Sequence, residues 1–260
     1  MRCRFEIIII AGIILGLFIS ACQSRRSDTS SIKRVVAARI GDKTVKQDYE
    51  IILPEDYKPG MKNPVLLVFH DKGEDGEKAI RKWENIAADT DYLLVCPTFP
   101  KNIQRVGGQE NERLMSIVQD LKDRHNINIR NLYVVGYGEG ARLAQVFSMN
   151  YPALVRGVVL ISGDNFAPPN PLGNSVPFLI ITGPGDRSMH GEALERRLAS
   201  EDYHVQLIKL KGETNVLSSK SAKLAIEFFQ KIPPLPPKVQ VENPPEEKIP
   251  QEGTQSEGEK

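Results

Sequence analysis

Short runs rich in Val, Ile and Leu alternate with amphipathic stretches from about residue 35 to residue 230. Near-continuous apolar runs are typical of strands buried on both faces, and apolar positions three and four residues apart are typical of helices packed on a sheet. The expected strands are 35–40, 48–54, 65–70, 92–97, 132–137, 157–162, 178–182 and 205–210, and the expected helices are 76–89, 110–125, 139–150, 189–200 and 218–230. Two strands precede the first helix, so we expect an antiparallel start. The order then predicts an α/β fold with a mostly parallel eight-stranded sheet and helices on both faces.

The N-terminal residues depart from this pattern. A basic start, "MRCR", precedes an apolar run at 7–21 that ends in "ISAC". The run is shorter than the roughly 20 residues of a membrane-spanning helix, and its pattern predicts a signal peptide over 1–21. "ISAC" resembles the lipobox of bacterial lipoproteins. That resemblance implies cleavage before Cys22 and a lipid anchor on it, in the cell envelope, with the outer membrane or cell surface favoured over the inner membrane. An uncleaved anchor helix is the alternative.

Composition divides the remainder into three parts. Residues 22–34 are polar and serine-rich, which predicts a flexible tether. Residues 35–231 are long enough for one α/β domain. Residues 232–260 are rich in Pro and Glu and cannot bury enough apolar surface to fold alone, so we expect a disordered tail. The tail is either a solvated spacer or a segment that binds a partner.

Charge and cysteine content exclude several functions. The chain has 34 Lys and Arg against 33 Asp and Glu, with a formal net charge of +1, which argues against nucleic-acid binding. Cys96 lies in an apolar strand pattern, "YLLVCP", and is expected to be a small buried residue. No two His fall with a carboxylate at zinc-ligand spacing, so we expect no metal and no other cofactor.

Three segments together carry a family resemblance. They are "YEIILPEDYKPGMKNPVLLVFHD", "WENIAADTDYLLVCPTFP" and "NINIRNLYVVGYGEGARLAQVFSMNYPALVRGVVLISG". Over about residues 45–230 the chain resembles α/β-hydrolases, most closely the esterase and poly(3-hydroxybutyrate) depolymerase-like group. The resemblance implies a catalytic triad whose serine sits on a tight turn between the fifth strand and the next helix.

The turn "GYGEG" keeps the glycines of such an elbow but not its serine. Gly136 and Gly140 occupy the flanking positions, and Gly138 stands where the resemblance places the nucleophile. Glycine has no side chain to form a covalent intermediate, yet it tolerates the positive φ that the elbow requires. The motif also fits the dinucleotide fingerprint Gly-x-Gly-x-x-Gly/Ala, with Asp164 as ribose ligand, which is a weaker alternative.

The other two triad positions follow from the same resemblance. The base, normally a histidine after the last strand, aligns with Asn215, or with Thr214 if the loop is one residue shorter. Neither side chain transfers protons near neutral pH. The acid position after the seventh strand is Asp186, for which we expect a structural role such as helix capping. The degenerate triad positions are therefore Gly138, Asp186 and Asn215.

The oxyanion region also departs from the pattern that the resemblance implies. Its donors would be the amide of Glu139 and the loop after the third strand, where the resemblance implies His-Gly and this chain has His70 and Asp71. A carboxylate there has the wrong sign to stabilise an oxyanion. His70 is the one histidine near the expected centre, either structural or a replacement base, and His125 is expected at the surface. A relocated carboxylate mechanism through Glu139 or Glu213 is a further alternative.

The cleft is expected to be open. The proline-rich segment 163–176 has no helical periodicity, so no lid domain fits there, and Phe166, Tyr137 and His70 are expected to line the cleft. We therefore expect a lipid-anchored protein with a hydrolase fold that is non-catalytic and binds a polymer, a glycan or a protein. The alternative is an atypical esterase or depolymerase that works without a serine.

Overall fold

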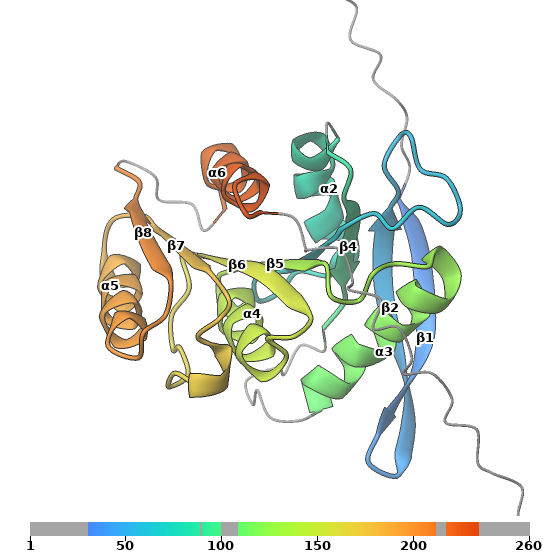
Figure 1. The fold of residues 1–260 in the computed structure, drawn as a ribbon, viewed down its shortest axis with the longest axis horizontal. Coiled ribbons are helices and arrows are strands. Elements are labelled where there is room, and N and C mark those ends of the chain that lie inside the picture. The colour runs from blue at the N-terminus through green and yellow to red at the C-terminus, as the bar shows by residue number, and fades with distance from the viewer. Residues whose placement is uncertain (1–30, 89, 100–108, 212–216, 234–260) are drawn as a thin grey trace, which may run out of the picture.

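The computed structural model describes residues 31–88, 90–99, 109–211 and 217–233 (Figure 1). The expected signal peptide, Cys22, most of the tether and residues 234–260 lie outside this range. Within it, no helix is both long and apolar enough to cross a membrane.

Eight strands form one sheet in the order β1-β2-β4-β3-β5-β6-β7-β8. The strands are β1 (Ile32–Ile40), β2 (Lys43–Ile52), β3 (Val65–Phe69), β4 (Leu93–Pro97), β5 (Leu132–Tyr137), β6 (Val155–Ile161), β7 (Phe178–Thr182) and β8 (Val205–Lys209). The β1–β2 and β2–β4 pairs are antiparallel and all other neighbours are parallel. The predicted mixed sheet with an antiparallel start is confirmed.

Helices cover both faces of this sheet (Figure 1). They are α2 (Gly76–Ala87), α3 (Gln109–His125), α4 (Glu139–Asn150), α5 (Asp186–Ala199) and α6 (Ser219–Gln230). Side chains of α3, α4 and α5 pack in one apolar cluster with Leu67 and Phe69 of β3. Side chains of α2 and α6 pack in a second cluster with Leu66 and Val68 of the same strand. Alternate residues of a strand face opposite sides, so each central strand contributes to both cores.

The first hairpin extends beyond its predicted bounds. β1 and β2 pair along their whole length around Gly41, which has a φ of +54°. Several residues of the hairpin are exposed and polar, because β1 is an edge strand with one partner. The apolar runs in the sequence therefore predict only the buried parts of β1 and β2.

The segment between β6 and β7 holds one short 3₁₀ helix, η1 (Pro171–Gly173), and no lid domain. The buried side chain of Gln145 on α4 fixes this segment. Its amide donates to the Ala167 carbonyl at 2.9 Å, and its oxygen accepts from the Ala167 N–H at 2.9 Å. The segment is thus held on α4 and adds no separate domain over the carboxyl end of β5.

Candidate functional site

The turn between β5 and α4 has the geometry of a nucleophile elbow. Gly138 has a φ of +58°, and its N–H donates to the Ile161 carbonyl at 3.1 Å. A Cβ built on Gly140 would lie 2.2 Å from the Phe69 carbonyl oxygen, and one on Gly136 would lie 2.3 Å from the Gly140 carbonyl oxygen. Both glycines are therefore required by the close approach of helix and strands.

The carboxylate of Asp71 fills the space in which a side chain at position 138 would project. A Cβ built on Gly138 would lie 2.0 Å from Oδ1 of Asp71 and 2.1 Å from its Cγ. The same Oδ1 accepts hydrogen bonds from the Glu139 N–H at 2.9 Å and from the Lys72 N–H at 2.8 Å. Asp71 thus takes up an amide at the start of α4, where the helix dipole favours a negative charge.

This arrangement bears directly on the oxyanion region. The Glu139 amide is the donor that the resemblance assigns to an oxyanion, and here its partner is a carboxylate of the same chain. A substrate carbonyl would have to displace that carboxylate before it could use the donor. The side chain of Glu139 is exposed and forms an ion pair with Lys72 at 3.4 Å.

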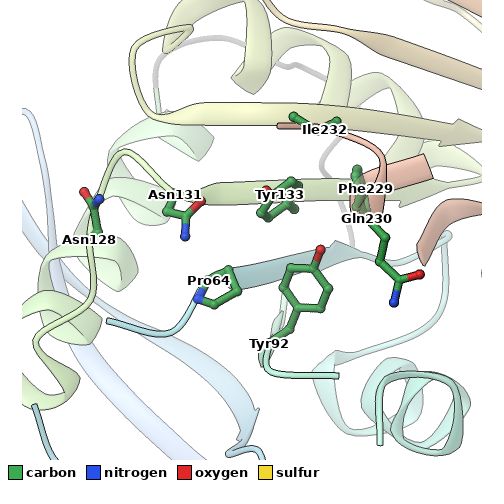
Figure 2. A pocket seen from close by; sticks show the side chains of 8 residues that line it. All are labelled: Pro64, Tyr92, Asn128, Asn131, Tyr133, Phe229, Gln230 and Ile232. Atoms are coloured by element: carbon green, nitrogen blue, oxygen red, sulfur yellow. The ribbon is translucent and has the colours of Figure 1, made fainter. Parts of the chain in front are cut away.

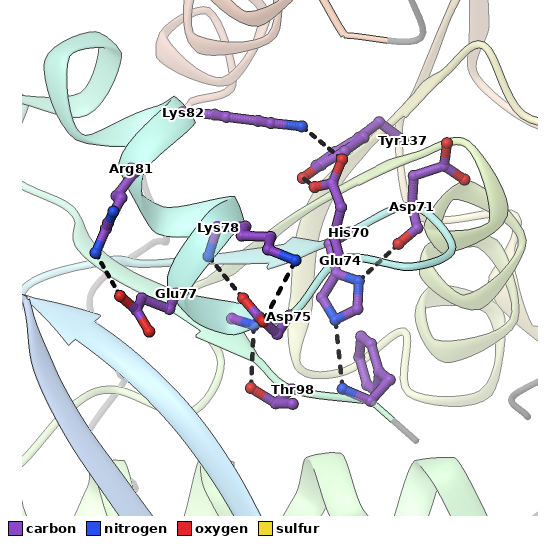
Figure 3. Close-up of polar contacts among 12 residues, drawn as sticks. His70, Asp71, Glu74, Asp75, Glu77, Lys78, Arg81, Lys82, Thr98 and Tyr137 are labelled. Carbon is purple, nitrogen blue, oxygen red and sulfur yellow. Dashed lines mark hydrogen bonds and ion pairs between the residues drawn. The ribbon is translucent and has the colours of Figure 1, made fainter. Parts of the chain in front are cut away.

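His70 lies at the end of β3 with both ring nitrogens occupied (Figure 3). Nδ1 lies 2.9 Å from the Asp71 carbonyl oxygen, and Nε2 accepts from the Phe99 N–H at 3.3 Å. These partners specify the neutral ring with its proton on Nδ1. Burial lowers the pKa of His70, which favours the same neutral state. No nitrogen remains to take a proton from a nucleophile, so the geometry fits a structural residue.

Glu74, Tyr137 and Lys82 form a second polar group beside Asp71 (Figure 3). The Tyr137 hydroxyl donates to Glu74 Oε2 at 2.5 Å, and Lys82 Nζ lies 2.5 Å from Glu74 Oε1 and 5.4 Å from the centre of the Tyr137 ring. Burial, followed by the hydrogen bond to Glu74, raises the pKa of Tyr137 well above its usual range. The expectation that Tyr137 and His70 line an open cleft is wrong, because the two residues are only 1% and 6% exposed.

Glu74 and Lys82 have no place in the sequence-based site. The signal for Glu74 is the charge density of "HDKGEDG", seven residues that directly follow the buried strand β3, whereas Lys82 comes from the next helix, α2. Charged residues clustered in a loop at the carboxyl end of a parallel strand lie where such sheets usually place their ligand-binding groups.

The remaining triad positions are only partly described. Asp186 is the first residue of α5, and its side chain lies outside the described part of the structure. The helix is capped by Gly185, with a φ of +90° and no side-chain hydrogen bond, so Asp186 does not occupy the capping position expected for it. Asn215, Thr214 and Glu213 also lie outside the described residues.

Other reactive groups are buried or scattered. Cys96 is fully buried, and burial raises the pKa of its thiol, which keeps it protonated. Among the described residues, no three His, Cys, Asp or Glu side chains are grouped so that they could hold a metal ion. The described elbow therefore contains a filled anion site and no free nucleophile.

Comparison with solved structures identifies the architecture. A CE1 ferulic acid esterase from Anaeromyces mucronatus matches with a TM-score of 0.64 at 14% identity, over 81% of this chain and 93% of that one. Fungal esterases from Rhizomucor miehei match with a TM-score of 0.64 at 15% identity, over 86% and 90%. A thermostable esterase matches with a TM-score of 0.62 at 17% identity, over 76% of this chain and 62% of that one. The chain has the α/β-hydrolase fold.

Sequence comparison gives a weaker signal. The chain is 30% identical over 115 residues to Protein NDRG3 of Xenopus tropicalis, and 28% identical over 115 residues to Protein NDRG3 of Xenopus laevis. These matches cover 39% of this chain and only 28% and 29% of the two relatives. No family model matches the chain.

Proposed function

We propose that this α/β-hydrolase-fold protein is a lipid-anchored component of the bacterial cell envelope that binds a ligand or partner without catalysing a reaction. One observation carries the proposal: the Asp71 carboxylate occupies the space beside Gly138 and accepts the Glu139 amide at 2.9 Å. The elbow turn is therefore complete as a structure, with its Gly138 and Glu139 amides paired within the chain.

The energetics support a non-catalytic role. In a serine hydrolase, removal of the nucleophile or of the base alone lowers turnover by a factor of about 10⁶, nearly as much as removal of the whole triad. Oxyanion donors give part of the activity that survives such a loss. Here the donor at Glu139 is already paired with a negative charge, so even that residual contribution is weakened.

The lipid anchor rests on the N-terminal sequence. A basic start, a short apolar run and "ISAC" lead to Cys22, and acyl chains on one terminus hold a protein on a membrane when more than one is attached. A Cys22→Ser variant, expressed with a palmitate analogue, is expected to lose label incorporation and to leave the membrane fraction. Equal labelling of both chains would remove the anchor from the proposal.

The catalytic question is tested with the full chain in detergent micelles. We expect no turnover of p-nitrophenyl acetate or butyrate above buffer and no labelling by a serine-directed fluorophosphonate, with an active serine esterase run in parallel. The alternative, an atypical hydrolase, is favoured by the Glu74 carboxylate beside the elbow. Turnover that disappears in Glu74→Gln or His70→Ala would establish that alternative.

A further inference from the structure

A pocket of about 360 Å³ lies at the opposite end of the central strands from the elbow (Figure 2). Eight residues line it: Pro64, Tyr92, Asn128, Asn131, Tyr133, Phe229, Gln230 and Ile232. Its volume is at the small end of the range for ligand pockets, roughly 300–1,000 Å³. We refer to these eight residues as the amino-end pocket.

The walls of the amino-end pocket are fixed by the sheet. Pro64, Tyr92 and Asn131 immediately precede β3, β4 and β5, which are neighbours in the sheet. The Leu93 N–H donates to the Pro64 carbonyl at 2.8 Å, and the Val65 N–H donates to the Asn131 carbonyl at 3.1 Å. Three loops distant in sequence are thus joined by backbone hydrogen bonds, so the pocket exists without a ligand to order it.

Aromatic rings form the apolar part of the pocket. The rings of Tyr92 and Tyr133 are 5.2 Å apart at 76°, and those of Tyr133 and Phe229 are 5.1 Å apart at 56°. Ile232 packs beside them over Gly157, where a Cβ would lie 2.4 Å from the Ile232 Cδ1. The absence of a side chain at Gly157 therefore lets the end of α6 close one side of the pocket.

The two tyrosine hydroxyls in the amino-end pocket have no hydrogen-bond partner among the described residues. Tyr92 and Tyr133 are 8% and 7% exposed, neither hydroxyl forms a hydrogen bond with any residue in the described range, and neither hydroxyl oxygen is fully buried. Figure 2 shows the Tyr92 hydroxyl pointing from its loop toward Tyr133. Because both hydroxyl oxygens remain accessible, a ligand with matching groups can bond them without displacing a partner from the chain. Burial raises the pKa of Tyr92, so this hydroxyl remains a donor.

Amide side chains surround these hydroxyls. Asn131 and Gln230 form no side-chain hydrogen bond within the described residues, and Asn128 uses only its Oδ1, which accepts from the Arg130 N–H at 3.1 Å. Amides and hydroxyls both donate and accept hydrogen bonds. No lining residue is charged, so the pocket offers nothing that specifically pairs with a phosphate, a carboxylate or an ammonium group.

We propose that the amino-end pocket binds a neutral saccharide of one or two rings. A sugar ring presents an apolar face for aromatic side chains and hydroxyls that donate and accept at its edge, which matches the lining. A proline-rich segment also packs on aromatic grooves, but proline has no N–H and would leave the amide oxygens without donors. This inference goes beyond the proposed function, because the pocket is separate from the elbow and its test does not involve ester turnover.

The experiment uses the full chain labelled with 3-fluorotyrosine, in a detergent without a sugar headgroup. The chain has seven tyrosines, and the Tyr92→Phe and Tyr133→Phe variants assign the two ¹⁹F resonances of the pocket. Maltose, cellobiose and N,N′-diacetylchitobiose are titrated separately. We expect at least one of them to shift these two resonances saturably and to leave the other five unchanged.

The variants make the assignment specific. Loss of one hydroxyl is expected to raise the Kd about fivefold in Tyr92→Phe and in Tyr133→Phe. Tyr151→Phe, whose ring packs on the other face of the sheet, is the matched control and is expected to leave the Kd unchanged. The unfolding midpoint of each variant establishes that it is folded.

Three results would overturn the proposal. The first is no saturable shift with any of the three sugars up to their solubility limits. The second is a uniform shift of all tyrosine resonances. The third is a response to a synthetic peptide of residues 233–241 with none to the sugars, which would assign the pocket to proline-rich chains instead.

Discussion

The two ends of the central strands both carry tyrosines and other polar residues, but they differ in how many of these groups have hydrogen-bond partners within the chain. At the carboxyl end, one Asp71 oxygen accepts the amides of Lys72 and Glu139, and the Tyr137 hydroxyl donates to Glu74. At the amino end, the hydroxyls of Tyr92 and Tyr133 have no partner within the described residues.

This contrast indicates that the candidate binding site of this chain is the amino-end pocket and not the carboxyl ends of the strands, where the fold usually binds ligands. α/β sheets commonly bind ligands at the carboxyl ends of their strands, and here the elbow amides of Gly138 and Glu139 are already paired within the chain. A ligand gains free energy by pairing groups that the folded chain leaves unpaired. Accessible hydroxyls without a partner among the described residues therefore make the amino-end pocket a candidate site despite its position in the sheet.

The largest expected loss of stability comes from Gly140→Ala, which tests whether the elbow is packed more rigidly than the amino end of the strands. In Gly140→Ala the new Cβ would meet the Phe69 carbonyl oxygen at 2.2 Å, and backbone cannot move aside cheaply. We expect a loss of at least about 3 kcal/mol in the free energy of unfolding. Urea unfolding, followed by the fluorescence of Trp83, the only tryptophan, measures it.

Gly157→Ala is the matched control at the amino end. Its Cβ would meet the terminal methyl of Ile232 at 2.4 Å, and that methyl can rotate away. We expect a loss of about 1 kcal/mol. Equal losses in the two variants would contradict the view that the elbow is the more tightly built end.

A double-mutant cycle tests whether Asp71 occupies the nucleophile space. Gly138→Ser alone is expected to cost about 3 kcal/mol, because its Cβ would overlap the Asp71 carboxylate at 2.0 Å and because φ is +58°. In an Asp71→Gly background only the backbone strain remains, so the cost is expected to fall by about 2 kcal/mol. Unfolding free energies of the four chains give the coupling.

Asp71→Asn supplies the control for this cycle. The carboxamide has nearly the shape of the carboxylate but no charge, so the overlap with a serine persists. We expect Gly138→Ser to be as costly in the Asp71→Asn background as in the parent chain. Relief by Asp71→Asn would show that charge, and not occupied space, excludes the serine.

The sequence predicted the sheet well, because its information is local and repeated. Val/Ile/Leu runs separated by amphipathic stretches specify buried strands and covering helices, and "GYGEG" specifies a turn that needs positive φ and close approach. The sequence also placed Asp71 near the expected oxyanion region. It could not show that the carboxylate lies against Gly138, since that contact joins two loops 67 residues apart.

Two expectations failed for identifiable reasons. Tyr137 was expected in the cleft, but it shares its strand face with Tyr133 and Val135, and that face is covered by α2 and α6. The period-two pattern of β5 contained this signal. His125 was expected at the surface and is 8% exposed, because Tyr57, from a distant loop, covers it and lies 3.0 Å from its Nδ1. No local pattern reveals such a contact.

The sequence also failed to reveal the amino-end pocket, because the pocket depends on contacts between distant segments. Its walls come from the residues before three strands and from the end of α6, and only the strand order brings them together. Asn128 and Asn131 look like ordinary turn residues in the sequence. The polar character of the pocket appears only when the hydrogen bonds of each tyrosine are compared.

The smallest expected changes in unfolding free energy come from removing one tyrosine hydroxyl at each end, in Tyr137→Phe and in Tyr92→Phe. Tyr137→Phe removes a 2.5 Å hydrogen bond to Glu74, whose carboxylate keeps Lys82 and some solvent contact. We therefore expect a loss of about 1.5 kcal/mol, at the low end for a hydrogen bond to a charged group. Tyr92→Phe removes a hydroxyl with no described partner, so its unfolding free energy is expected to stay within about 0.5 kcal/mol of the parent chain. A loss in Tyr92→Phe as large as that in Tyr137→Phe would mean that the Tyr92 hydroxyl is already satisfied, and the amino end would then be as closed to ligands as the elbow.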